Sequence, residues 1–128
     1  MDKIRRVLVV DDDIDIRSAV AEGLVLEGYA VETAGNGLEA LKVVRLTSPD
    51  AIVLDLMMPI MDGWTFLARC RTQSWCREVP IVVLSAAYAL RAARERLRDF
   101  GVRVVVTKPF DLESLIGTIQ ACAPLASR

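Results

Sequence analysis

AIVLDLMMPIMDG, residues 51–63, joins an apolar run to a single carboxylate, Asp55, and then to a proline and an Asp-Gly pair. Aspartate is disfavoured in the interior of a strand and fits better at its end. Proline and the Asp-Gly pair favour a loop and a turn directly after it. The stretch therefore predicts a buried strand over residues 51–54, with Asp55 held at its tip and facing a loop.

Short apolar runs of this kind recur along the chain and alternate with segments of helical spacing. A run without polar alternation is typical of a strand that is covered on both faces. The strands are expected at residues 5–10, 29–34, 51–54, 79–84 and 102–106. The helices are expected at residues 14–27, 36–45, 64–72 and 88–100, and from a capping Asp111 to residue 121. This alternation predicts an α/β fold with an open, doubly wound parallel sheet.

The bulk composition limits the class of protein. Sixteen basic and seventeen acidic residues give a net charge of −1, which argues against wholesale binding to nucleic acid or to an anionic membrane. No apolar run approaches the roughly 20 residues that span a bilayer. We expect residues 1–128 to form a single cytoplasmic domain with no output domain and no membrane insertion. Cys70, Cys76 and Cys122 form no close pair in the sequence and are expected to be reduced thiols.

The conspicuous polar residues all fall at the predicted carboxyl ends of strands. Asp11 and Asp12 follow the first strand, Asp55 ends the third, Ser85 ends the fourth and Lys108 ends the fifth. In open parallel sheets, ligands bind beyond these ends, where the strand order reverses. The five residues are therefore expected to meet on one rim of the sheet.

Three carboxylates on one rim would repel each other, and one of them would tend to take up a proton. A divalent cation removes that repulsion, and an all-oxygen ligand set suits Mg²⁺, or Mn²⁺, better than zinc. The chain contains no histidine, so Asp55 is the candidate nucleophile, able to form an acyl phosphate. The Lys108 ammonium and the Ser85 hydroxyl are suited to bind the phosphoryl oxygens. The rim therefore predicts a phosphoryl-transfer site.

Four motifs in this order and spacing resemble those of the receiver domains of two-component response regulators. They are VVDDD at residues 9–13, LDLMMPIMDG at 54–63, LSA at 84–86 and TKPF at 107–110. The resemblance covers essentially the whole chain and implies a flavodoxin-like sheet of strand order 2-1-3-4-5. It implies that Asp55 accepts a phosphoryl group from a phosphohistidine on a sensor histidine kinase or a histidine phosphotransfer protein. Ser85 and Lys108 would hold that group.

The resemblance also implies a set of metal ligands. Asp12 would bind Mg²⁺ directly and Asp11 largely through water, and Asp55 and the main-chain carbonyl of Met57 would complete the set. The triple aspartate leaves a choice of pair. Asp11 and Asp12 are favoured because the apolar strand stops just before them. Asp13 is then a helix-start residue, which is favourable at the positive end of the helix dipole.

One position departs from the family pattern and affects the expected output. Many receivers carry an aromatic residue three positions before the lysine, where this chain has Val105. Tyr88 is a candidate substitute, and an ordinary half-buried tyrosine at a helix start is the alternative interpretation. Residues 89–103 are rich in arginine, which indicates either a solvated helix or a docking surface for an acidic partner. The family signals through the face formed by helix 88–100, strand 102–106 and the helix after Asp111.

Two other functions remain open from the sequence. The motif Asp11-x-Asp13 after an apolar strand also resembles the nucleophile motif of haloacid-dehalogenase-type phosphatases. Such an enzyme needs a late carboxylate pair, for which only Asp111 and Glu113 are available. The chain could instead be an interaction module with a receiver fold that works without phosphorylation. The intact set of acidic residues, serine and lysine argues against that interpretation, and Val105 argues for it.

Overall fold

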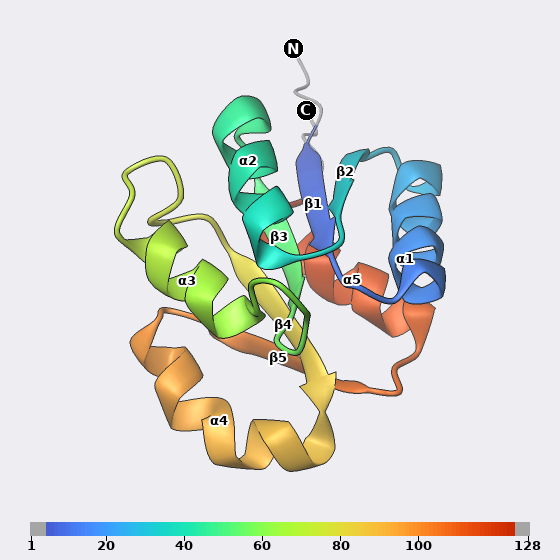
Figure 1. Ribbon diagram of the computed structural model, residues 1–128. Helices are drawn as coiled ribbons and strands as arrows, with labels where there is room; N and C mark the ends of the chain where they lie inside the picture. Colours follow the sequence, from blue (N-terminus) through green and yellow to red (C-terminus); the bar gives the residue numbers. More distant parts are fainter. Residues whose placement is uncertain (1–4, 125–128) are drawn as a thin grey trace.

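The computed structural model describes residues 5–124, which contain a five-stranded parallel sheet (Figure 1). The strands are β1 (Arg6–Val10), β2 (Ala30–Ala34), β3 (Ala51–Asp55), β4 (Ile81–Ala86) and β5 (Val104–Lys108). Their order is β2-β1-β3-β4-β5, and every neighbouring pair is parallel. The flavodoxin-like sheet that the resemblance implies is confirmed. The strand order changes direction once, between β1 and β3.

Helices cover both faces of the sheet. They are α1 (Ile14–Leu26), α2 (Gly37–Thr47), α3 (Gly63–Arg71), α4 (Ala87–Asp99) and α5 (Leu112–Cys122). α1 and α5 pack side by side on one face, and α2, α3 and α4 lie on the other (Figure 1). Within residues 5–124, no helix combines the length and the apolar character needed to cross a membrane.

Side-chain caps fix where four of these helices begin. Asp13, Asn36, Asp62 and Asp111 each accept a hydrogen bond from a main-chain N–H in the first turn that follows. Such caps satisfy donors that have no partner inside the helix. The interpretation of Asp13 as a helix-start residue is therefore confirmed, as are the capping roles expected of Asn36 and Asp111.

The core consists of two layers, one on each face of the sheet. On β1, Leu8 and Val10 point into the layer under α2, α3 and α4, and Val7 and Val9 point into the layer under α1 and α5. β3 divides in the same way, and all five of its residues are buried. Apolar side chains on both faces explain why the strand sequences show no polar alternation.

The starts of β4 and β5 differ most from the sequence prediction, and both differences have the same cause; β1 and β2 start only one residue later than predicted. Val79 and Val102 are apolar but precede β4 and β5. The main-chain N–H of Val79 bonds to the carbonyl of Cys76, and that of Val102 bonds to the carbonyl of Leu97. These residues therefore complete turns after α3 and α4. Each strand starts two residues later than predicted and extends two residues further.

The expectation that no two cysteines pair is wrong. Cys70, near the end of α3, and Cys76, in the loop that leads to β4, are joined by a disulfide with 5.1 Å between their Cα atoms. The loop turns back on α3, with Gln73 N–H bonding to Cys70 O and Cys76 N–H bonding to Gln73 O. A spacing of six residues in the sequence therefore becomes a short distance in the fold. Cys122 is free, as expected.

Candidate functional site

Four of the predicted site residues meet at the carboxyl edge of the sheet. Carboxylate oxygens of Asp11, Asp12 and Asp55 lie within 4.8 Å of one another. Lys108 Nζ lies 3.0 Å from Asp11 Oδ2 and 3.4 Å from Asp55 Oδ2. β1, β3 and β5 end on the same rim, which explains how residues almost a hundred positions apart come together.

Asp11 is held rigidly at the end of β1. Its side chain is fully buried, and Oδ1 accepts a hydrogen bond from the N–H of Asp13 at 2.9 Å. Its main-chain N–H bonds to Ala34 O, and its main-chain oxygen accepts a bond from Arg17 Nη1 at 2.9 Å. Asp12, by contrast, is exposed. The pair therefore combines one fixed buried carboxylate with one that faces solvent.

Asp55 is the last residue of β3 and is 5% exposed. Its Oδ1 accepts a hydrogen bond from the N–H of Met57 at 3.2 Å. The loop returns immediately, because Gly63 donates its N–H to Leu56 O at 2.9 Å. A Cβ on Gly63 would lie 2.6 Å from the main-chain oxygen of Asp55. The glycine in the opening motif therefore permits the close approach that holds Asp55 in place.

The electrostatic balance of the site leaves Asp55 hard to ionise. Burial, followed by the charge of Asp11, raises the pKa of Asp55 to about 6, against the lowering effect of Lys108. Burial alone lowers the pKa of Lys108, but its contacts with Asp11 and then Asp55 outweigh that effect and leave the pKa raised. One ammonium group thus faces three carboxylates, and the site carries an excess of negative charge.

This excess fits a divalent cation. The donors offered are carboxylate oxygens, which hard ions such as Mg²⁺ and Mn²⁺ prefer. Among residues 5–124, Asp11, Asp12 and Asp55 form the only group of three or more His, Cys, Asp or Glu residues close enough to share an ion. Met57 lies in the loop next to Asp55, and a ligand role for its main-chain carbonyl stays a prediction.

Ser85 lies within β4 and is 1% exposed. Its Oγ is the buried side-chain polar atom that lacks a hydrogen-bond partner in the described part of the chain. It follows Leu84, the partner of Asp55 in the ladder between β3 and β4. Buried hydroxyl groups are rarely left unpaired without a reason. A ligand oxygen beyond the strand ends would give this hydroxyl its acceptor.

The structure answers the question about Tyr88 and shows supporting contacts around the site that the sequence did not predict. Tyr88 is 79% exposed at the start of α4, so it is neither half-buried nor turned inward as a substitute for an aromatic at position 105. Gly63 belongs to the opening motif, but its close approach to Asp55, like the hydrogen bond from Arg17 to the main-chain oxygen of Asp11, depends on the fold and is not predicted by composition or spacing. The Lys108–Pro109 peptide bond, next to the site, is cis.

Comparisons with known proteins agree with this geometry. The family model described as "Response regulator receiver domain" matches residues 7–120. Response regulator MprA of Mycobacterium leprae is 42% identical over 117 residues, covering 91% of this chain and 50% of that protein. Transcriptional regulatory protein PrrA of the same organism is 40% identical, covering 91% and 48%. The chain therefore spans about half the length of these curated relatives.

Solved structures give the same result. The chemotaxis response regulator CheY4 of Vibrio cholerae has a TM-score of 0.86 and 36% identity, covering 94% of this chain and 99% of that one. A response regulator from Chloroflexus aurantiacus, described as putative, has a TM-score of 0.85 and 29% identity, covering 94% and 98%. The chain belongs to the response regulator receiver domain family of two-component systems.

Proposed function

We propose that this chain is a phosphorylation-controlled switch in which Asp55 is the phosphoacceptor. Receiver domains act in general as such switches, and the family match over residues 7–120 supports one receiver unit. The observation that carries the proposal is the pairing of buried Asp55 with Lys108 Nζ, 3.4 Å away, beside a second buried carboxylate. A sensor histidine kinase or a histidine phosphotransfer protein would supply the phosphoryl group.

In-line phosphoryl transfer depends on positioning and charge neutralisation, and different residues around Asp55 would supply each of these. An Asp55 oxygen attacks phosphorus, the bond from phosphorus to the donor's imidazole nitrogen breaks, and an acyl phosphate forms. Lys108 would bind one phosphoryl oxygen, and the unpaired Ser85 hydroxyl would donate to another. Asp11, Asp12, Asp55 and the carbonyl of Met57 would hold Mg²⁺, which when bound offsets the negative charge of the site.

The phosphatase alternative loses support in the fold. Asp111 caps α5 and accepts bonds from the N–H and Oγ of Ser114, each at 2.9 Å. Neither Asp111 nor Glu113 belongs to the carboxylate cluster found among residues 5–124. Asp11, the nucleophile in that alternative, already bonds to Lys108 and to the N–H of Asp13. Asp55 is therefore the better candidate.

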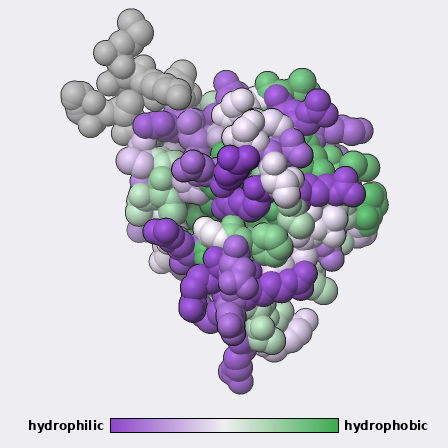
Figure 2. All heavy atoms as spheres, turned by 90° about the vertical axis from the view of Figure 1, so that its left-hand side faces the viewer, coloured by the Kyte–Doolittle hydropathy of each residue, from purple (hydrophilic) through white to green (hydrophobic). Residues whose placement is uncertain are grey.

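We propose further that output passes through a groove between α4 and β5. This α4–β5 groove has a volume of about 420 Å³ and is lined by Arg94, Arg98, Val102, Arg103 and Val105. Figure 2 shows hydrophilic side chains projecting from the lower part of the face that carries α4. Among residues 5–124, the salt bridges involve Arg5, Arg6 and Lys108, and none involves the three arginines of the groove.

The arginine charges and the apolar floor of the groove, formed by Val102 and Val105, indicate which kind of partner would bind there. The arginines that line this groove would repel the same surface of a second copy, so self-association is disfavoured and an acidic partner is favoured. Val105 is smaller than the aromatic residue that many receivers carry at this position, so the floor leaves room for a bulky apolar side chain. The partner segment is therefore acidic and carries such a side chain.

The phosphoacceptor is tested by intact-mass spectrometry after incubation with acetyl phosphate. With Mg²⁺, wild type is expected to gain about 80 Da, the mass of one phosphoryl group. Asp55→Asn, and wild type with a chelator in place of Mg²⁺, are expected to gain none. An equal gain in Asp55→Asn would refute the assignment of Asp55. No gain in any form would favour an interaction module that works without phosphorylation.

The groove is tested with poly-L-glutamate as an acidic probe, followed by amide NMR. Shifts are expected at residues 102–105 and along α4, and Arg94→Gln/Arg98→Gln is expected to weaken binding about tenfold, roughly 1.4 kcal/mol. Arg45→Gln/Arg69→Gln removes the same charge from exposed positions on α2 and α3. Equal loss in both double variants would mean that only net charge matters, and the groove would not be a specific site.

A further inference from the structure

The disulfide between Cys70 and Cys76 lies at the opposite end of the molecule from the phosphorylation site. It joins α3 to the loop that leads to β4, and both cysteines are fully buried. Their Cα atoms, 5.1 Å apart, lie within the range of roughly 4.4–6.8 Å that a disulfide spans without backbone movement. The neighbours Thr72, Gln73 and Ser74 are exposed. Opening of this loop would therefore bring the two sulfurs to solvent.

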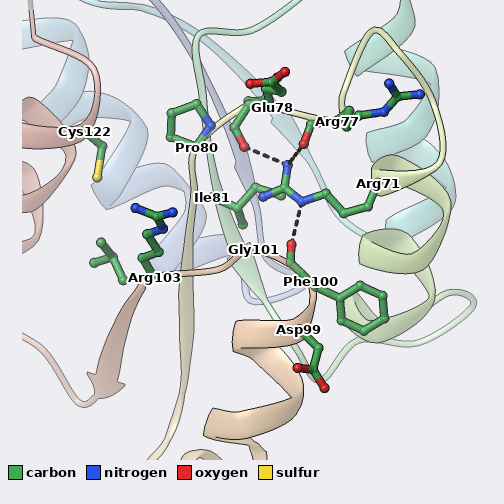
Figure 3. Close-up of a pocket in the computed structure, with 12 residues that line it drawn as sticks. Arg71, Arg77, Glu78, Pro80, Ile81, Asp99, Phe100, Gly101, Arg103 and Cys122 are labelled. Atoms are coloured by element: carbon green, nitrogen blue, oxygen red, sulfur yellow. Dashed lines mark hydrogen bonds between the residues drawn. The ribbon is translucent and has the colours of Figure 1, made fainter.

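Arg71 connects this loop to the end of α4. Its Nη1 donates to the main-chain oxygens of Cys76, Arg77 and Val79 at 3.0, 3.0 and 2.9 Å. Its Nε donates to the main-chain oxygen of Phe100 at 2.7 Å. Figure 3 shows the Arg71 side chain reaching from α3 between the loop and Phe100, at the edge of a pocket of about 580 Å³. One guanidinium thus fixes both segments at once.

Phe100 in turn leads directly into the α4–β5 groove. It is the C-cap of α4, and Gly101 follows with φ of 76°, a left-handed conformation that suits glycine. Val102 and Arg103, the next two residues, line the groove. The carbonyl that Arg71 holds is therefore two residues from the groove wall. A change in the loop that moves Arg71 would displace the main chain at Phe100 and then at Val102.

The expected cytoplasmic location bears on the role of this disulfide. In a compartment where the thiol pool is kept reduced, a protein disulfide is usually transient and is either catalytic or redox-sensing. No residue of the phosphorylation site lies near the pair in sequence, and Cys122 remains as the third, free cysteine. A catalytic role has no support, whereas the link through Arg71 gives the pair a structural effect on a distant surface.

We propose that Cys70 and Cys76 form a reversible redox clasp whose oxidation fixes the α3–β4 loop and, through Arg71, the Phe100 end of the α4–β5 groove. The thiol chemistry does not depend on phosphorylation. Only the significance of the groove as an output surface rests on the proposed function. The chain would then take two inputs at opposite ends of the sheet, one phosphoryl and one redox, that converge on the same surface.

The oxidant is a low-molecular-weight disulfide, and the exchange balances. When the loop opens, one cysteine thiolate attacks a sulfur of the small disulfide and releases one small thiolate, leaving a mixed disulfide. The second cysteine thiolate then attacks the protein sulfur of that mixed disulfide and releases the second small thiolate. Two protein thiols lose two electrons and two protons in total, and the small disulfide is reduced to two thiols.

The clasp is tested in Cys122→Ser, which keeps the pair and removes the third thiol. After equilibration in buffers of reduced and oxidised glutathione, the protein is quenched and alkylated in denaturant. Two alkylations are expected under reducing conditions and none under oxidising ones. The oxidised protein is expected to weigh about 2 Da less and to melt about 7 °C higher, because a short loop is closed in the unfolded chain. Cys76→Ser/Cys122→Ser is expected to show no such rise.

Hydrogen exchange distinguishes a clasp from a purely local bond. The amides of residues 100–102 are expected to exchange at least about threefold more slowly in the oxidised form, while those of residues 57–61, in the loop after β3 at the other end of the sheet, exchange by local opening and stay unchanged. Failure of the pair to bond at any glutathione ratio would overturn the proposal. So would a bond that leaves residues 100–102 unaffected. Neither result depends on acetyl phosphate, so the phosphorylation proposal stands or falls separately.

Discussion

Asp55→Asn is expected to stabilise the metal-free protein by about 2 kcal/mol at neutral pH. The carboxylate is buried beside Asp11, and these two effects, in that order, raise the pKa of Asp55 to about 6. At pH 7 the folded protein therefore carries a charge that the fold disfavours. Asparagine keeps the shape and removes that charge, and the melting temperature is expected to rise by about 6 °C.

The raised pKa of Asp55 determines how the stabilisation by Asp55→Asn depends on pH. The pKa of Asp55 is higher in the folded state than in the unfolded one, so the carboxyl group stabilises the fold when protonated. That contribution is lost as the pH rises from about 4 to about 6. The advantage of Asp55→Asn should therefore appear across this interval and vanish below it.

Thermal or urea unfolding in the presence of a chelator, repeated from pH 3.5 to 7.5, measures both the stabilisation by Asp55→Asn and its dependence on pH. Asp99→Asn removes one exposed carboxylate at the end of α4 and is expected to change stability by less than about 0.5 kcal/mol. If Asp55→Asn is no more stable than wild type at pH 7.5, or if its advantage is the same at every pH, Asp55 is not electrostatically disfavoured in the fold.

Gly63→Ala is expected to destabilise the protein by about 3 kcal/mol, the scale of a backbone overlap in a packed interior. The new Cβ would lie 2.6 Å from Asp55 O and 2.8 Å from Leu56 Cα. Both are backbone atoms of the strand end, so no side-chain rotation relieves the contact. The displacement falls on Asp55 itself, and the rate of phosphorylation by acetyl phosphate is expected to fall as well.

Gly117→Ala is the matched control for this substitution. Gly117 lies inside α5, and a Cβ there would meet no atom within 4 Å. Alanine is the better helix former, so this variant is expected to gain about 0.5 kcal/mol. Urea unfolding of both variants gives the comparison. Equal stability of the two would mean that the loop after β3 can move away from Asp55, contrary to the close packing described above.

The sequence was sufficient for the fold because its signals were local and repeated. Unbroken apolar runs predicted strands covered on both faces, and residues such as Asn36 and Asp111 predicted helix starts that the structure confirms. The strand ends then predicted one rim. The structure brings Asp11, Asp12, Asp55 and Lys108 together there, as expected. The functional roles of these residues, and of Ser85, stay predictions.

What the sequence could not supply depends on distances between segments. Val79 and Val102 look like strand residues, and only their turn hydrogen bonds exclude them from β4 and β5. Cys70 and Cys76 meet because the loop folds back on α3, and no spacing rule predicts that return. Arg71 is one of several arginines in the sequence. Its four main-chain acceptors come from residues 76, 77, 79 and 100, which become neighbours only in the fold.

The most direct test of the central claim is to map the phosphorylated residue after treatment with acetyl phosphate and Mg²⁺. Reduction with borohydride converts an aspartyl phosphate into a stable homoserine, which peptide mass spectrometry then locates. We expect a single modified residue, Asp55, in the peptide that carries residues 51–63. Modification of Asp11 instead would contradict the assignment of Asp55 and restore the phosphatase interpretation.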